Sequence, residues 1–152
     1  MIKLIGLSFL LLAFTLNVSA DVVLDDDVKE QADTQSVNSS YDWEPVMKAI
    51  IQVESGGNAK AKSGSSCGAM QITPILVVEC NNILKRRKSK KRFSLRDRFS
   101  IEKSKEMFVL IQSYFNPLND IEKAIRAWNG GNNYSVKRTQ RYFEKVMSLI
   151  KK

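Results

Sequence analysis

Histidine is absent from this chain of 152 residues. Its absence excludes the usual Ser-His and Cys-His forms of catalysis, which need an imidazole as the base. It also excludes most zinc sites, in which imidazole is a common ligand. Any chemistry must therefore depend on carboxylates, hydroxyls, amides or amines, and we expect neither a metal ion nor another cofactor.

Cysteine is scarce as well, with only Cys67 and Cys80 in the sequence. In an oxidising compartment a bridge between them would close a loop of about fourteen residues and stabilise the fold by up to roughly 3 kcal/mol. Two buried thiols, which pack as small apolar groups, are the alternative. We predict the disulfide, ahead of that alternative.

Long apolar runs are missing except at the N-terminus. Lys3 precedes an apolar stretch from Leu4 to Val18, and Ser19-Ala20 supplies small residues where a signal peptidase cleaves. The stretch is short for a membrane span, and acidic residues follow it directly. The sequence therefore predicts a signal peptide over residues 1–20, export to the periplasm or cell exterior, and no stable membrane span after cleavage. An uncleaved N-terminal anchor is the alternative.

Charge is unevenly distributed along the remaining chain. Residues 21–44 carry eight acids against Lys29 alone, whereas residues 45–152 carry twenty-two Lys and Arg against eight acids. A basic exported domain is expected to meet polyanions such as cell-wall polymers or membrane surfaces. The predicted export argues against nucleic acid as a partner, and nothing indicates a protein partner.

Composition and periodicity divide the chain after residue 20 into two segments. Residues 21–40 are polar and acidic without an apolar period, which predicts a flexible leader. Residues 41–152 are long enough for one compact domain, and their periodicity predicts a mainly α-helical fold with at most a small β-hairpin near 58–67. Each expected helix has its own start and stop signals. The expected helices are 42–55, 73–84, 100–116, 119–130 and 138–150.

Two of these helices have identifiable capping residues. Asp42 is expected to cap the first helix, and Asn119 with Glu122 forms a capping box at the start of the fourth. Between the second and third helices, residues 85–98 (KRRKSKKRFSLRDR) are strongly basic. We expect a solvated loop there, with binding of anionic peptide stems or wall polymers as the alternative.

Glu54 lies at an unusual place for an acid. It falls in the last turn of the first predicted helix, beside an apolar stripe that includes Ile50 and Val53 and just before Gly56-Gly57. An anion is disfavoured at this negative end of a helix, and burial raises the pKa of a carboxyl group further. Such a group is suited to donate a proton near neutral pH.

Four short blocks place further polar and aromatic residues in a defined order. The blocks are Glu54-Ser55-Gly56-Gly57, Gly68-Ala69-Met70-Gln71-Ile72, Ala127-Trp128-Asn129-Gly130 and Thr139-Gln140-Arg141-Tyr142. The series resembles the lytic transglycosylases of the soluble (SLT) type, relatives of goose-type lysozyme, over roughly residues 42–150. The third block usually contains Ala-Tyr-Asn, so Trp128 lacks a hydroxyl that the family has and keeps a stacking surface.

The resemblance implies a single lysozyme-like domain that acts on the glycan strands of peptidoglycan. By position it implies Glu54 as the catalytic acid. It also implies a set of substrate-binding residues: Ser55, Met70, Gln71, Trp128, Asn129 and Tyr142.

No second acid occupies any block, although ordinary glycosidases need two carboxylates. The chemistry that the resemblance implies uses one: Glu54 serves first as acid and then as base, and the β-1,4 bond after N-acetylmuramic acid is cleaved to leave a 1,6-anhydro end. A true lysozyme, in which water attacks, and a catalytically silent wall-binding module are the alternatives.

Overall fold

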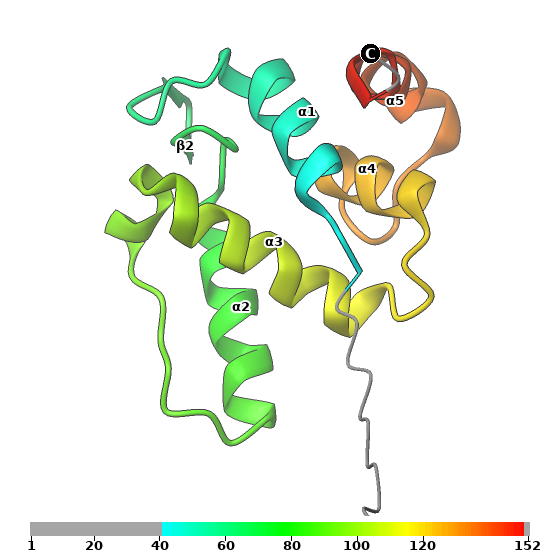
Figure 1. Cartoon of the computed structure of the whole chain (residues 1–152). Coiled ribbons are helices and arrows are strands. Elements are labelled where there is room, and N and C mark those ends of the chain that lie inside the picture. Colours follow the sequence, from blue (N-terminus) through cyan, green and yellow to red (C-terminus); the bar gives the residue numbers. More distant parts are fainter. Residues whose placement is uncertain (1–40, 151–152) are drawn as a thin grey trace, which may run out of the picture. The chain divides into compact units, whose positions relative to one another are not determined.

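The computed structural model describes residues 41–150, so the predicted signal peptide and acidic leader lie outside the described residues. Residues 41–150 form five α-helices, a two-stranded antiparallel hairpin and one 3-10 helix (Figure 1). Their order is α1 (Glu44–Ser55), β1 (Lys62–Ser63), β2 (Ser66–Cys67), α2 (Pro74–Arg86), η1 (Leu95–Phe99), α3 (Ile101–Phe115), α4 (Ile121–Gly130) and α5 (Val136–Ile150). The predicted mainly α-helical fold with a small hairpin is confirmed. Among residues 41–150, no helix has the length and apolar character that a bilayer crossing requires.

The helix starts differ from the predicted ones in detail. The N-cap residue of α1 is Trp43 and not the predicted Asp42. The Asp42 carboxylate nevertheless accepts a hydrogen bond from the Glu44 N–H at 2.9 Å. The capping box predicted for α4 is wrong. Asp120 caps that helix by accepting a hydrogen bond from the Lys123 N–H, and the Glu122 carboxylate binds the Arg126 Nε at 2.6 Å instead.

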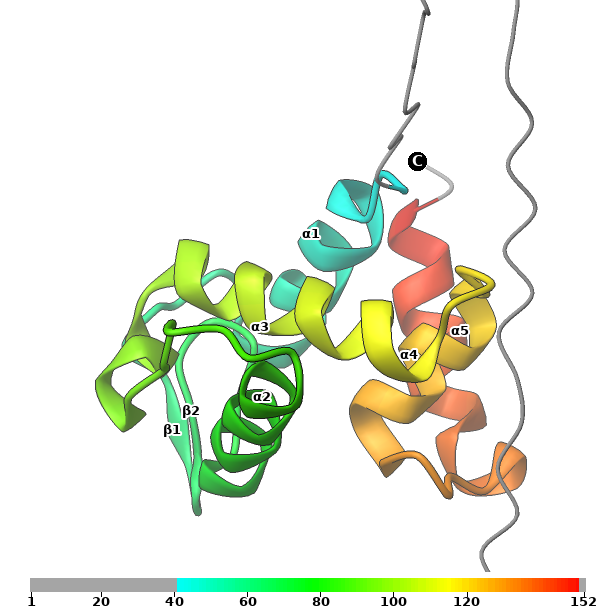
Figure 2. The same cartoon turned by 90° about the horizontal axis from the view of Figure 1, so that it is seen from below.

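The core forms where α3 passes between the other helices. The hairpin and α2 lie to one side of α1 and α3, and α4 and α5 lie to the other (Figure 1, Figure 2). Phe108 of α3 is fully buried, and its ring lies against the rings of Trp43 and Trp128, with centroid distances of 5.6 and 5.1 Å. Ile50 of α1 and Ile125 of α4 are also fully buried in this cluster. The apolar stripes thus meet in one core.

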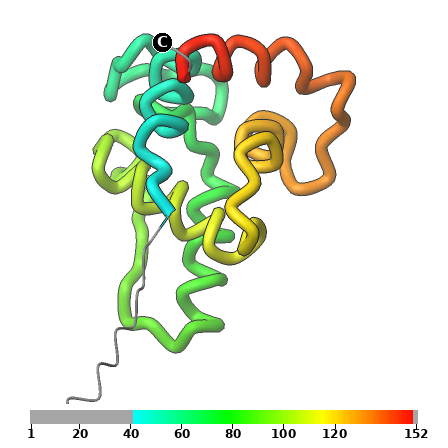
Figure 3. Tube along the Cα trace, turned by 45° about the vertical axis from the view of Figure 1, so that its right-hand side comes forward, coloured from blue at the N-terminus to red at the C-terminus, as the bar shows by residue number. Residues whose placement is uncertain are grey.

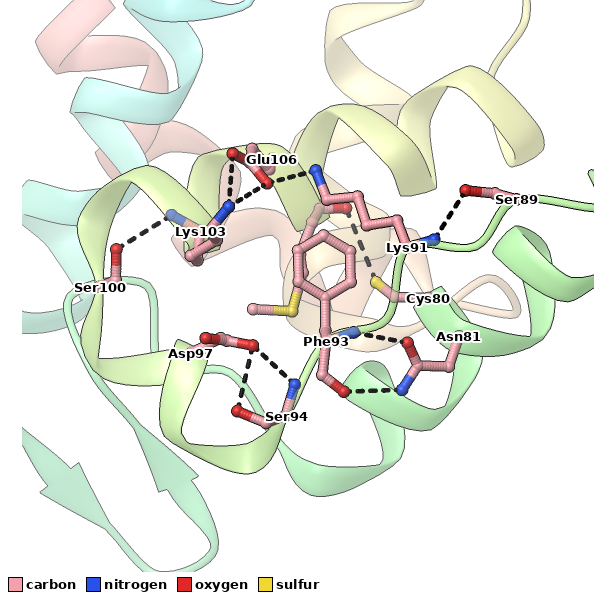
Figure 4. A network of polar contacts seen from close by, with 11 residues as sticks. Cys80, Asn81, Ser89, Lys91, Phe93, Ser94, Asp97, Ser100, Lys103 and Glu106 are labelled. Atoms are coloured by element: carbon pink, nitrogen blue, oxygen red, sulfur yellow. Dashed lines mark hydrogen bonds and ion pairs between the residues drawn. The ribbon is translucent and has the colours of Figure 1, made fainter.

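The basic stretch 85–98 is better ordered than a solvated loop. Its first two residues end α2, and its last four belong to η1. Phe93 is buried, and its backbone N–H and carbonyl exchange two hydrogen bonds of 2.8 Å with the Asn81 side chain of α2 (Figure 4). The prediction was wrong for Phe93 because a side-chain amide satisfies the backbone groups that burial would otherwise leave unpaired.

Arg98 is the one buried cation of this stretch. Its guanidinium donates to the carbonyls of Leu95, Ser65 and Ile72, and it therefore ties η1 to the hairpin and to the segment that follows it. Every other Lys or Arg between residues 85 and 98 is exposed, as predicted for a solvated surface.

The predicted disulfide is not formed. Cys67 and Cys80 are both free thiols, and both are buried. The Cys80 sulfur lies 3.9 Å from the carbonyl oxygen of Met107 on α3. Burial, reinforced by the nearby Glu79 carboxylate, raises the pKa of the Cys80 thiol to about 12. The two cysteines therefore pack as small apolar groups, which was the alternative.

Gly68 allows the chain after β2 to pass directly against η1. Its φ is +78°, and a Cβ placed there would lie 1.7 Å from the carbonyl oxygen of Arg98. We predict that Gly68→Ala lowers the free energy of unfolding by roughly 3 kcal/mol or more, because a left-handed alanine is combined with an overlap of backbone atoms. Urea unfolding followed by circular dichroism measures the loss.

Gly64, in the turn of the hairpin that precedes Gly68, provides the matched control. Its φ is +56°, but no atom lies within 4 Å of the position of a Cβ. Gly64→Ala should therefore cost only about 1–2 kcal/mol, the usual penalty for a left-handed alanine. Equal losses in the two variants would contradict the close approach of Gly68 to η1.

Candidate active site

Glu54 is positioned by the way in which α1 ends. Gly56 takes a left-handed φ of 61°, and its N–H donates to the Gln52 carbonyl at 3.0 Å. This conformation suits glycine, and it turns the chain away directly after the last helical turn. Glu54 therefore remains on α1 while the following loop leaves it uncovered on one side.

Tyr142 of α5 binds the acid directly. Its hydroxyl donates to Glu54 Oε1 at 2.7 Å. Burial raises the pKa of the Glu54 carboxyl above its ordinary value, and the hydrogen bond from Tyr142 acts in the opposite direction. Burial and the charge of Glu54 in turn raise the pKa of Tyr142, so the phenol remains a donor. Among residues 41–150 no cation forms an ion pair with Glu54. These surroundings favour a protonated carboxyl group.

Ser55 holds the second sequence block against α1. Its hydroxyl lies 2.8 Å from the Ala69 carbonyl, to which it donates. Ser55 was predicted to bind substrate, but it lines none of the hollows next to Glu54. Met70 is fully buried in the core, so the prediction of a substrate contact is wrong for its side chain.

Gln71 belongs to the same block, is half-buried, and has a backbone conformation that is unusual for a residue other than glycine. Its φ is 50°, and its side-chain amide donates to the Gly68 carbonyl at 2.9 Å. This bond ties the side chain to its own turn and leaves the amide oxygen free to accept. A left-handed non-glycine residue is costly and often marks a functional site.

Trp128 and Asn129 come from the end of α4. The indole N–H of Trp128 donates to the Met70 carbonyl at 3.3 Å, which joins the third sequence block to the second. Asn129 is exposed and lines each of three adjoining hollows in the surface.

Two hollows meet at Glu54 and Asn129, which line both of them. One, of about 280 Å³, is otherwise lined by Ser63, Ser66, Gln71, Thr73, Leu76 and Trp128. The other, of about 470 Å³, is otherwise lined by Val53, Arg138, Arg141, Tyr142 and Lys145. A third, of about 300 Å³, continues from the first past Trp128 towards Ile75 and Phe115. Because they share lining residues, these hollows adjoin one another, and we refer to them together as the groove at Glu54. An extended chain that occupied the first two would pass Glu54.

The structure therefore brings together five of the seven predicted site residues: Glu54, Gln71, Trp128, Asn129 and Tyr142. Sequence reasoning missed Thr73 and Leu76, and it missed three cations of α5. The spacing of Arg138, Arg141 and Lys145 at i, i+3 and i+7 is the signal that would have placed those cations on one face.

Arg126 is a further residue that sequence reasoning missed. It is buried, and it donates to the Val136 carbonyl, the Thr139 hydroxyl and the Gln140 amide oxygen at 3.1, 3.1 and 2.8 Å. Its guanidinium also lies 4.3 Å from the centre of the Phe143 ring. Arg126 thus attaches α4 to the first turns of α5. The far end of α5 lies along α1, where Leu149 and Ile150 share a hollow with residues 45–52 (Figure 3). These contacts set the position of Tyr142.

Within residues 41–150, no three His, Cys, Asp or Glu side chains are grouped so that they could hold a metal ion. A family model described as Transglycosylase SLT domain matches residues 34–149. Comparisons with curated proteins and with solved structures found no match to this chain.

Glu54→Gln is expected to stabilise the fold at neutral pH. The amide avoids the burial of a charge and still accepts the hydrogen bond from Tyr142. Because burial raises the pKa of Glu54 above 4.5, the wild-type chain is favoured below that pH and loses this advantage as the pH rises through the raised pKa. The gain from Glu54→Gln should therefore be larger at pH 7 than at pH 4. Urea unfolding at both values measures it.

Glu102→Gln is the control of opposite sign. Hydrogen bonds from the helix backbone and from Ser100 lower the pKa of the Glu102 carboxyl, so its contribution to stability is present above the ordinary pKa and is lost as the pH falls. This variant should lose a little stability at pH 7 relative to pH 4. A Glu54→Gln variant that behaves in the same direction as Glu102→Gln would contradict the burial of the acid.

Proposed function

The chain belongs to the transglycosylase SLT domain family, and we propose that it cleaves peptidoglycan glycan strands without hydrolysis. The observation that carries the proposal is the environment of Glu54. Its carboxyl group is partly buried, has a raised pKa, and lies where two hollows of one groove meet. A group of this kind donates a proton to a chain that crosses it.

In the first step, protonated Glu54 gives its proton to the oxygen that links C1 of N-acetylmuramic acid to C4 of N-acetylglucosamine. The C1–O bond breaks, and its electron pair goes to the leaving oxygen. Positive charge develops at C1, and the sugar's own N-acetyl group supports it. Burial of Glu54 supports this step because it keeps the acid protonated at higher pH than an exposed glutamate.

In the second step, the Glu54 carboxylate accepts the proton of the C6 hydroxyl while O6 bonds to C1. The product is a 1,6-anhydro end, Glu54 is protonated again, and no water is consumed. One group serves as acid and then as base, as microscopic reversibility allows. Tyr142 supports the intermediate stage because its hydroxyl donates to the newly formed carboxylate.

The residues beside Glu54 support this single-carboxylate chemistry. Within the described residues, the two hollows that meet at Glu54 have no other acid in their linings. A two-carboxylate glycosidase would need a second acid roughly 5–9.5 Å away across the sugar. Gln71 and Asn129 provide amide groups for sugar hydroxyls and acetamido groups, and Trp128 provides an aromatic surface beside them.

Export to the periplasm or the cell exterior is part of the proposal. Peptidoglycan lies outside the cytoplasm, and residues 1–20 have the sequence of a signal peptide. A secreted chain that begins at Asp21 would support export, and a cell-associated chain that begins at Met1 would contradict it.

The test of the reaction is the mass of the products released from purified glycan strands. Wild-type protein should release anhydro-ended fragments, each lighter by one water than the corresponding hydrolysis product. Glu54→Gln should lower the rate at least about 100-fold, because it removes the proton donor, with an unchanged circular dichroism spectrum. Glu144→Gln, at an exposed position of α5 outside the groove, is the matched control and should retain activity.

Two outcomes separate the alternatives. Fragments that carry one additional water would indicate a true lysozyme. Binding of the strands without any product from the wild-type protein would indicate a silent wall-binding module.

A further inference from the structure

One side of the groove at Glu54 is lined by cations from α5. Arg138, Arg141 and Lys145 are all exposed, and all three line the hollow of about 470 Å³ that begins at Glu54 and Tyr142. Their spacing of three and then four residues places them on one face of the helix. The groove therefore has a strongly positive wall immediately beside the proposed acid.

Glu54 is the only acid among the described residues that line this hollow, and it is not paired with the cations. None of the three cations forms an ion pair within residues 41–150. Glu144 is the only acid of α5; it accepts a hydrogen bond from Gln140 and lies outside the hollow. Three like charges on one helix face repel one another, so the arrangement is favoured when an anion binds there.

The other side of Glu54 has different chemistry. Ser63, Ser66, Gln71 and Thr73 present hydroxyl and amide groups, and no Lys or Arg lines that hollow. Neutral groups of this kind suit the hydroxyls and acetamido groups of a glycan. Cations are not needed for an uncharged sugar ring. The positive wall therefore points to an anionic substituent rather than to the glycan itself.

We propose that Arg138, Arg141 and Lys145 bind the carboxylates of the peptide stem carried by the N-acetylmuramic acid on which Glu54 acts. This inference rests on the proposed function, since it names the part of the same substrate that occupies the cationic hollow. The stem is attached to the sugar whose C1 reacts, so it begins close to Glu54 and extends into the adjoining hollow. Guanidinium groups bind carboxylates through paired N–H donors, which makes the two arginines the principal contacts.

The basic stretch 85–98 does not offer the same site. Arg87 and Lys91 line a separate hollow that contains none of the residues around Glu54. Lys91 is also paired with Glu106 at 2.6 Å. Removing positive charge from that stretch therefore tests whether the net charge of the protein alone, away from the groove, affects binding.

The test measures affinity in chains that carry Glu54→Gln, so that turnover does not interfere. The probes are two synthetic tetrasaccharides of alternating N-acetylglucosamine and N-acetylmuramic acid. Both carry the same peptide stem, with free carboxylates in one and with primary amides in the other. At low salt, the chain with Glu54→Gln alone should bind the carboxylate form about tenfold more tightly, because exposed ion pairs are individually weak but add together. The preference should decrease as salt is raised.

Two further variants locate the preference. Adding Arg138→Gln, Arg141→Gln and Lys145→Gln should reduce the ratio of the two affinities to about one. Adding Lys85→Gln, Lys88→Gln and Lys90→Gln removes the same charge from exposed positions of the basic stretch and should leave the ratio unchanged. Circular dichroism establishes that each variant is folded.

A ratio of one in the chain with Glu54→Gln alone, or a ratio that survives the loss of the α5 cations, would overturn the inference. Cleavage of the amide tetrasaccharide by the wild-type protein tests the proposed function separately. Cleavage without a preference for the carboxylate form would overturn only the inference. A preference for the carboxylate form without any cleavage would support the carboxylate site and overturn the proposed reaction.

Discussion

The hydrogen bond from Tyr142 to Glu54 joins two residues that are 88 positions apart, and the site depends on it. It orients the carboxyl group without supplying the full positive charge that would make the group strongly acidic. Burial raises the pKa of Glu54, and the neutral phenol opposes that effect only in part. An arginine in the place of Tyr142 would favour the charged carboxylate and would make Glu54 unsuited to the proposed proton transfer.

The scaffold around this bond is held by contacts between helix ends. Arg126 attaches α4 to the start of α5, and Trp128 attaches the end of α4 to the carbonyl of Met70. Ser55 attaches the end of α1 to the same block through the Ala69 carbonyl. These bonds converge on the groove from three elements, so side chains from distant parts of the chain are fixed relative to Glu54. Precise placement of this kind is what the proposed proton transfer requires.

Much of the site was predictable because its residues belong to short blocks at helix ends. Glu54, Gln71, Asn129 and Tyr142 all lie at the groove, as the order of the blocks indicated. Met70 was misjudged because it directly precedes Gln71, which lines the groove, while its own side chain is buried in the core as those of Ala69 and Ile72 are. The basic stretch was misjudged at Phe93 and Arg98, because the bonds of Asn81 to Phe93 and of Arg98 to the hairpin link residues that no local pattern connects.

The sequence by itself determined the helical elements and the family and singled out Glu54 as the candidate acid, because these depend on local periodicity, helix stop signals and short blocks. Only the tertiary structure decided which face of α5 turns towards Glu54. That choice buries Tyr142 against the acid and places Arg138, Arg141 and Lys145 along one side of the groove. The physical reason is that the packing of α5 on α1 and α4 sets the rotation of the helix, and this packing depends on contacts between distant residues.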